Sequence, residues 1–121
     1  MKKLVYIAHP VSGNIKSNLE SIIKIGRDIN LNDSNVIPFV PYFFDLQCLD
    51  DNIPNERNKG IENNSHYFNS SIIDELWLYG KTISRGMNEE IKLALKNDIP
   101  VIPKTEETKI QLKQLQCRHH P

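Results

Sequence analysis

Apolar and polar positions alternate with different periods along the chain, and each change of period predicts a new element. The apolar run of residues 4–8 stops at turn-forming residues 9–14, which predicts a strand and then a loop. From Ile15 to about residue 32, apolar residues recur three or four positions apart, as on one face of a helix. Three further strands are predicted at 36–40, 72–79 and 99–103, with helices at 55–71, 84–97 and 105–116. This alternation predicts an α/β, Rossmann-like three-layer fold with a short, mainly parallel sheet of four to five strands.

Residues 42–55 interrupt this alternation because they show no sustained period. The segment begins with Tyr42, Phe43 and Phe44 and continues with acidic residues. It predicts a long functional loop or a short helical turn that could act as a lid. The aromatic side chains are expected in the core or at a subunit contact, with base stacking as the less favoured alternative.

Composition indicates one ordinary domain and excludes several partners. With 121 residues and 39% hydrophobic positions, one core is expected, so we assign 1–116 to a single domain and 117–121 to a flexible tail. Fifteen basic and fifteen acidic residues provide no broad basic surface for a nucleic-acid polymer or an anionic membrane. The absence of a long apolar run and of a secretory leader predicts a cytoplasmic protein. Cys48 and Cys117 have no CxxC spacing, so no metal site is expected.

The chemistry is expected in the loops that follow the strands. Parallel sheets bind ligands outside the carboxyl ends of their strands, which selects residues 9–14, the segment after Val40, and residues 79–86. Ser84 can cap the helix that follows it, and Gly86 lets a ligand approach the backbone. Backbone amides at this helix start could bind an anion. The alternative is an ordinary capped helix start.

Helical phase separates the two adjacent glutamates of this helix. At about 100° per residue, Glu89 points nearly opposite the apolar stripe that contains Met87 and Ile91. Glu90 lies at the edge of the stripe, about 80° from its mean direction, where a carboxylate can be half-buried beside a crevice. Glu90 is therefore the candidate functional acid, although both residues could merely complement the positive end of the helix.

The first strand and its loop supply a second candidate group. Tyr6 and the loop that contains His9, Ser12 and Gly13 would face the same crevice. Neither GxGxxG nor GxxxxGK[ST] is present, so the usual dinucleotide and ATPase loops are not indicated. His9 could contact a substrate or serve the turn, whereas Asp74, at the opposite end of its strand, is interpreted as structural.

Together these motifs resemble the nucleoside 2-deoxyribosyltransferase superfamily, including its nucleotide N-glycosidases and an uncharacterised phage and bacterial branch. The resemblance spans about residues 4–103. It rests on 5–13 (VYIAHPVSG), on 74–77 (DELW), on Ser84-Arg85-Gly86 followed by Glu90, and on 99–102 (IPVI). The family has a Rossmann-like parallel sheet and assembles as dimers or larger oligomers with sites near subunit contacts.

The resemblance implies roles for individual residues. Glu90 would be the nucleophile and Tyr6 an active-site residue. A serine at the Ser84 position is typical of hydrolases that bind a nucleotide 5′-phosphate rather than of transferases that act on free nucleosides. The implied substrate contacts come from His9, Ser12, Gly13, Ser84, Gly86 and Met87. The family's acid on the helix before Asp74 has no counterpart here, and the nearest positions are Asn64 and His66.

Three functions remain open at this point. The first is cleavage of a nucleotide N-glycosidic bond by hydrolysis or (deoxy)ribosyl transfer, with Glu90 as nucleophile and without a cofactor or metal. The second is a non-catalytic protein that senses or sequesters a nucleotide, possible because the helix acid is missing. The third is an NAD-type glycohydrolase. A homodimer or larger homo-oligomer is expected in each case, from the aromatic residues 42–44 and from the resemblance.

Overall fold

The computed structural model describes residues 1–119, and it alternates strands and helices along most of the chain. The elements run in the order β1 (Lys3–Ala8), α1 (Ile15–Asn32), β2 (Val36–Phe39), α2 (Pro41–Cys48), α3 (Pro54–Asn69), β3 (Glu75–Leu78), α4 (Arg85–Lys96), β4 (Val101–Pro103) and α5 (Glu106–His119). Each helix from α1 to α4 begins at a residue suited to a helix start, and the cap predicted at Ser84 is confirmed. The side chain of Asn14 caps α1 and that of Ser84 caps α4, whereas α2 and α3 each begin with a proline.

The four strands form one sheet in the order β2-β1-β3-β4, and all neighbours are parallel. Tyr6 pairs with Phe39 on one side and with Leu76 on the other. The chain leaves β1 in one direction to form β2 and returns on the other side to form β3. This reversal creates a crevice beyond the carboxyl ends of β1 and β3, the usual ligand position in such folds. The predicted α/β, Rossmann-like fold is confirmed.

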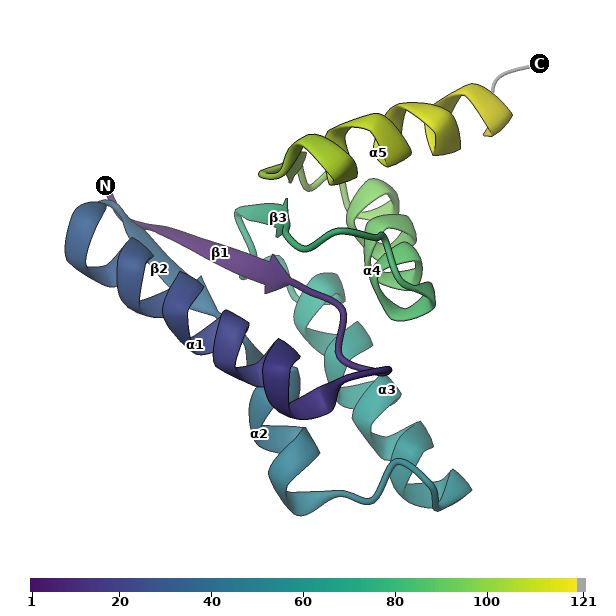
Figure 1. Ribbon diagram of the computed structural model, residues 1–121. Helices are drawn as coiled ribbons and strands as arrows, with labels where there is room; N and C mark the ends of the chain where they lie inside the picture. The colour runs from purple at the N-terminus through teal and green to yellow at the C-terminus, as the bar shows by residue number, and fades with distance from the viewer. Residues whose placement is uncertain (120–121) are drawn as a thin grey trace.

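Helices cover both faces of the sheet, and alternate residues of β1 point to opposite faces. Val5 and Ile7 join Ile29 of α1 in one buried cluster. Tyr6 and Ala8 point the other way, into a larger cluster built by α3, α4 and α5. Figure 1 shows α1 running across the near side of β1 and β2, with α3 and α4 behind the sheet. The alternation along β1 therefore places the side chain of Tyr6 on the face of the sheet that α3 and α4 cover.

Three boundaries differ from the sequence-based expectation. Of the two alternatives for residues 42–55, the helical one holds over Pro41–Cys48, which form α2, since Pro41 starts the helix and the loop that follows is short. The strand expected over 72–79 is regular only at Glu75–Leu78, because its ladder to β1 begins at Glu75. Residues 117–119, expected in a tail, continue α5, and the rest of that expected tail lies outside the described residues.

The turn after β3 depends on Gly80. Its φ of +93° is a conformation that residues with a side chain rarely adopt, and an added Cβ would lie 2.6 Å from Cδ of Pro10. We expect Gly80→Ala to lower the free energy of unfolding by about 1–3 kcal/mol, from backbone strain and the clash with the loop after β1. Urea denaturation followed by circular dichroism measures this change.

Gly26→Ala is the matched control for Gly80→Ala. Gly26 lies inside α1 and an added Cβ meets nothing within 4 Å, so the same substitution there should stabilise by about 0.5–1 kcal/mol. Equal effects of the two substitutions would contradict the strain assigned to the turn at Gly80.

Candidate active site around Glu90

Three polar side chains from three elements meet beside the sheet. The hydroxyl of Tyr6 contacts Oδ1 of Asn64 at 2.8 Å and also contacts Oε2 of Glu90. Nδ2 of Asn64 donates to the same oxygen of Glu90 at 3.3 Å. Tyr6 comes from β1, Asn64 from α3 and Glu90 from α4. Every pair in this triad is therefore in hydrogen-bond contact.

Local periodicity explains why each helix turns its polar residue inward. Glu90 lies on the buried face of α4, where Met87, Ile91 and Ala94 pack into the core. Asn64 precedes the fully buried Phe68 by four residues and so lies one turn away on the same face of α3. The ring of Phe68 packs 4.8 Å from the ring of Tyr6. Packing of Phe68 against β1 thus brings Asn64 to the hydroxyl of Tyr6.

Aromatic rings enclose Tyr6 on its other sides. The Phe39 ring meets the Tyr6 ring edge-on at 6.3 Å, and the Tyr42 ring lies 5.8 Å away. The hydroxyl of Tyr42 donates to the carbonyl oxygen of Ile7 at 2.7 Å, which anchors the first turn of α2 to β1. The core position expected for the aromatic residues is confirmed for Tyr42, which forms a wall of the site, whereas Phe44 of the same helix is 69% exposed.

Burial dominates the electrostatics of the triad. It raises the pKa of Glu90 to about 7, against the opposing effect of the hydrogen bonds from Tyr6 and Asn64. Burial, followed by the charge of Glu90, also raises the pKa of Tyr6 well above its usual value. The same two causes raise the pKa of Tyr42. The site thus combines one carboxyl group that titrates near neutral pH with two tyrosines that stay protonated.

The two oxygens of Glu90 have different surroundings. Both contacts from the triad reach Oε2. Among the described residues, Oε1 has no hydrogen-bond partner, yet no buried polar side-chain atom is left without one. Oε1 therefore keeps some contact with solvent, in a residue that is 9% exposed overall. One oxygen is held by the triad and the other is not.

The start of α4 lies one turn before Glu90. The hydroxyl of Ser84 accepts a hydrogen bond from the amide of Met87 at 3.2 Å, which leaves its own hydrogen free to donate. The amides of Arg85 and Gly86 precede the first intrahelical bond and have no partner within the helix. A Cβ added to Gly86 would meet only Oγ of Ser84, at 4.0 Å, so the space beside it is open. Gly86 and Glu90 share a face because they are four residues apart.

Helical phase predicted that Glu89 faces solvent and that Glu90 lies beside the apolar face, and both positions are confirmed. The side chain of Glu89 is 62% exposed and pairs with Lys92 at 3.4 Å. Glu90 is more deeply buried than the half-buried position expected for it, because α3 and β1 close over its side of the helix. The catalytic role of Glu90 stays a prediction.

The loop after β1 divides into a fixed and an exposed part. His9 is buried, with Nδ1 2.7 Å from the carbonyl oxygen of Pro10 and Nε2 3.0 Å from Oγ of Ser21. Both ring nitrogens are thus used within the protein, and His9 holds the loop against α1. Ser12 and Gly13 are exposed, and Gly13 has a φ of +96°. Of the residues expected to contact substrate here, these two leave their polar groups accessible.

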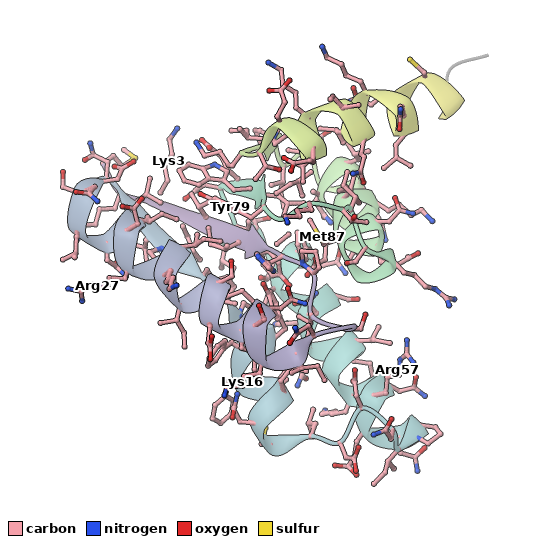
Figure 2. All side chains as sticks on the ribbon, in the orientation of Figure 1. Lys3, Lys16, Arg27, Arg57, Tyr79 and Met87 are labelled. Atoms are coloured by element: carbon pink, nitrogen blue, oxygen red, sulfur yellow. The ribbon has the colours of Figure 1, made fainter. Side chains whose placement is uncertain are left out.

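Other candidates occupy structural positions. Met87 belongs to the first turn of α4 and its side chain lies in the interior, 1% exposed, whereas Lys16, Arg27 and Arg57 extend outward from the molecule (Figure 2). The side chain of Met87 is therefore not accessible to a ligand, and its amide already donates to Ser84. Asp74 accepts a hydrogen bond from the amide of Leu4 at 2.7 Å, as its structural interpretation predicted.

Sequence analysis missed two members of the site. Asn64 was noted only as a position where an acid is lacking, although its spacing of four residues from Phe68 could have placed it on the buried face of α3. Tyr42 was expected in the core or at a subunit contact, but no periodic signal marks its contact with β1.

Among the side chains of residues 1–117, which the structure describes, no three of His, Cys, Asp or Glu come together as a set that could hold a metal ion. In the same part of the chain, no helix has the length and apolar character needed to cross a membrane. A hollow of about 490 Å³ lies between the start of α1 and the α2–α3 loop, but Glu90 does not line it.

The fold and this site define a three-layer α/β domain with a buried carboxyl group at the crevice of its parallel sheet. The chain belongs to the family described as Domain of unknown function (DUF7768), whose model matches residues 3–104. This match covers every strand, helices α1 to α4 and all three residues of the triad. No curated protein and no solved structure matches the chain.

Proposed function

We propose that this protein cleaves the N-glycosidic bond of a nucleotide, by hydrolysis or by transfer of the (deoxy)ribosyl group, with Glu90 as the nucleophile. The observation that carries the proposal is the arrangement of Glu90. One of its oxygens is held by Tyr6 and Asn64, and the other keeps some contact with solvent. A carboxyl group fixed in this way is suited to attack a sugar carbon from one direction.

The reaction divides into two steps. Oε1 of Glu90 forms a bond to C1′ of the sugar while the bond from C1′ to the base nitrogen breaks, which leaves a glycosyl ester. Water, or the hydroxyl or base of an acceptor, then attacks C1′ and releases the carboxylate. Tyr6 and Asn64 contact only Oε2, so they can hold the carboxyl group in place during both steps.

The start of α4 supports a phosphorylated substrate. The hydroxyl of Ser84 and the amides of Arg85 and Gly86 can all donate to phosphate oxygens, beside the positive end of the helix. Gly86 and Glu90 are separated by one turn, about 5–6 Å along the helix axis. The 5′-phosphate and C1′ of a nucleotide are only a few bonds apart, so one molecule could reach both. Ser12 and Gly13 would contact its sugar or phosphate.

In the decisive experiment, the purified protein is incubated with ribo- and deoxyribonucleoside monophosphates and with NAD. The products are then separated by chromatography. We expect a free base from at least one monophosphate. Gly86→Leu is the site variant: leucine suits a helix, but its side chain would fill the open space beside Ser84. This variant should fold and lose base release. Release of nicotinamide alone would instead indicate an NAD-type glycohydrolase.

The matched control for Gly86→Leu is Gly26→Leu, on the opposite side of the sheet and also without atoms near an added Cβ. It should keep wild-type turnover. Folded wild-type protein that releases no base from any nucleotide tested would refute the catalytic proposal.

A second candidate function is nucleotide binding without turnover. It is favoured by Asn64, which provides an amide where the resembling family has an acid to protonate the departing base. Calorimetry combined with chemical analysis of the recovered ligand separates the two functions. Tight binding of an unchanged nucleotide supports sequestration or sensing, whereas recovery of an altered nucleotide excludes it.

A homodimer is part of the proposal. It rests on the family resemblance and on Phe44 of α2, whose 69% exposed aromatic side chain is available for a subunit contact. Light scattering at micromolar concentration tests it, and a monomer under these conditions would contradict it.

A further inference from the structure

Tyr6, Asn64 and Glu90 form a closed triangle of contacts, and each contact requires a hydrogen between its two atoms. The contacts are Tyr6 Oη to Asn64 Oδ1, Asn64 Nδ2 to Glu90 Oε2, and Tyr6 Oη to Glu90 Oε2. The side-chain amide supplies the hydrogen for only one of these, because its oxygen faces the other neighbour. The phenol has a single hydrogen and can supply only one more.

The third hydrogen must come from Glu90. With an ionised carboxylate, one side of the triangle would bring two lone pairs together without a hydrogen. With a protonated carboxyl group, Glu90 donates to Tyr6, Tyr6 donates to Asn64, and Asn64 donates back to Glu90. Exchanging the oxygen and nitrogen of the Asn64 amide reverses the direction of the ring but leaves the count unchanged.

We infer that the ligand-free site stores one proton on Glu90 in a closed hydrogen-bond ring with Tyr6 and Asn64, and that Asn64 is the positioning residue that closes this ring. Each member both donates and accepts, an arrangement in which hydrogen bonds strengthen one another in a poorly solvated site. Ionisation of Glu90 must break one side of the ring.

Among the described residues, no cation contributes to the pKa of Glu90. Besides Tyr6 of β1, the titratable group facing Glu90 is Tyr42 of α2, and both phenols keep their protons. On this face β3 contributes Leu76 and Leu78, which are apolar and fully buried. On α4 itself, Glu89 points to solvent. Burial accordingly raises the pKa of Glu90 to about 7.

If the site cleaves an N-glycosidic bond, the stored proton can be transferred to the departing base. This role of the proton rests on the proposed function. Attack by Oε1 forms the bond to C1′, the bond from C1′ to the base nitrogen breaks, and the base leaves with the electron pair. The base then needs one proton. The ring contains one that the glycosyl ester cannot keep, so the proton leaves Oε2 and ends on the base nitrogen. Asn64 thereby compensates for the missing helix acid.

Nuclear magnetic resonance of the full-length, ligand-free protein tests the ring directly. The ¹³C signal of the Glu90 carboxyl group, the ¹⁵N signal of the Asn64 amide and the ¹³Cζ signal of Tyr6 should titrate together, with one midpoint close to pH 7. Glu90→Gln assigns the carboxyl signal and should abolish the other two titrations. The amide of Asn97, bonded to Asn69 and Leu93 elsewhere, should stay constant. A Glu90 that is ionised throughout pH 5–8 would overturn the inference. An Asn64 signal that stays constant while Glu90 titrates would also overturn it.

Two variants separate a positioning role from a general structural role. Asn64→Leu opens the ring and should displace the midpoint shared by Tyr6 and Glu90, whereas Asn63→Leu, at the neighbouring position, should leave it unchanged. An unchanged midpoint in folded Asn64→Leu would remove Asn64 from the ring.

Kinetics test the use of the proton separately. If the base takes the ring proton, single-turnover base release should fall about tenfold per pH unit above the midpoint. A rate that rises through that midpoint would overturn proton delivery by the ring. Absence of base release at every pH would refute the proposed function alone, because the magnetic resonance titration decides the ring without turnover.

Discussion

Glu90→Gln should lower the rate of base release by more than about a thousandfold while the protein stays folded. The amide keeps the size of the side chain but is a far weaker nucleophile, so no glycosyl ester can form at that position. Binding and orientation by the rest of the site cannot replace the covalent step. Glutamine also keeps polar atoms beside Tyr6 and Asn64, with an acceptor oxygen and a donor nitrogen in place of the two carboxyl oxygens. Single-turnover chromatography on the best nucleotide of the panel measures the loss.

Glu89→Gln is the matched control, since it makes the same chemical change one position earlier on the same helix. Glu89 is 62% exposed and contacts only Lys92, so its loss should change the free energy of unfolding by no more than about 0.5 kcal/mol. Turnover should stay near the wild-type value. Similar activities of the two variants, or an inactive Glu89→Gln, would show that Glu90 is not the nucleophile.

Glu90→Gln should also remove a pH dependence of stability worth about 3 kcal/mol. The pKa of Glu90 is about 7 in the folded protein, against an ordinary value of 4.5. Between these values the folded state binds a proton that the unfolded state has released, so the free energy of unfolding falls as pH rises. The fall begins near pH 4.5, ends above about pH 7, and amounts to about 1.4 kcal/mol for each unit of the pKa difference.

Urea denaturation at pH 4.5 and at pH 8 measures this effect. The stability of Glu90→Gln relative to the wild type should increase by about 3 kcal/mol between the two pH values. All other titrating groups, such as the Lys3–Glu75 pair, are common to both proteins and cancel in the comparison. Glu89→Gln should run parallel to the wild type. A parallel curve for Glu90→Gln would mean that the carboxyl group titrates normally in the folded protein.

Comparison of the predicted and observed elements shows where sequence reasoning was sufficient. The strands at β1, β2 and β4 and the helices α1, α3 and α4 lie close to the predicted ranges. The opposite exposures of Glu89 and Glu90 also follow from the predicted phase. Segment 41–48 was less predictable, because α2 is short and its apolar residues follow no clear helical period.

What the sequence by itself determined about this protein is its local periodicity: which stretches are strands or helices, which face of each helix is apolar, and which loops follow the strands. The tertiary structure alone decided which polar residues meet. Tyr6 contacts Asn64 and Glu90 across 58 and 84 positions of the chain, so no local pattern connects them. Their contact depends on the order of the strands and on how closely α3 and α4 pack against β1. That packing buries Glu90 and raises its pKa, because the cost of removing a carboxylate from water is set by its neighbours in space.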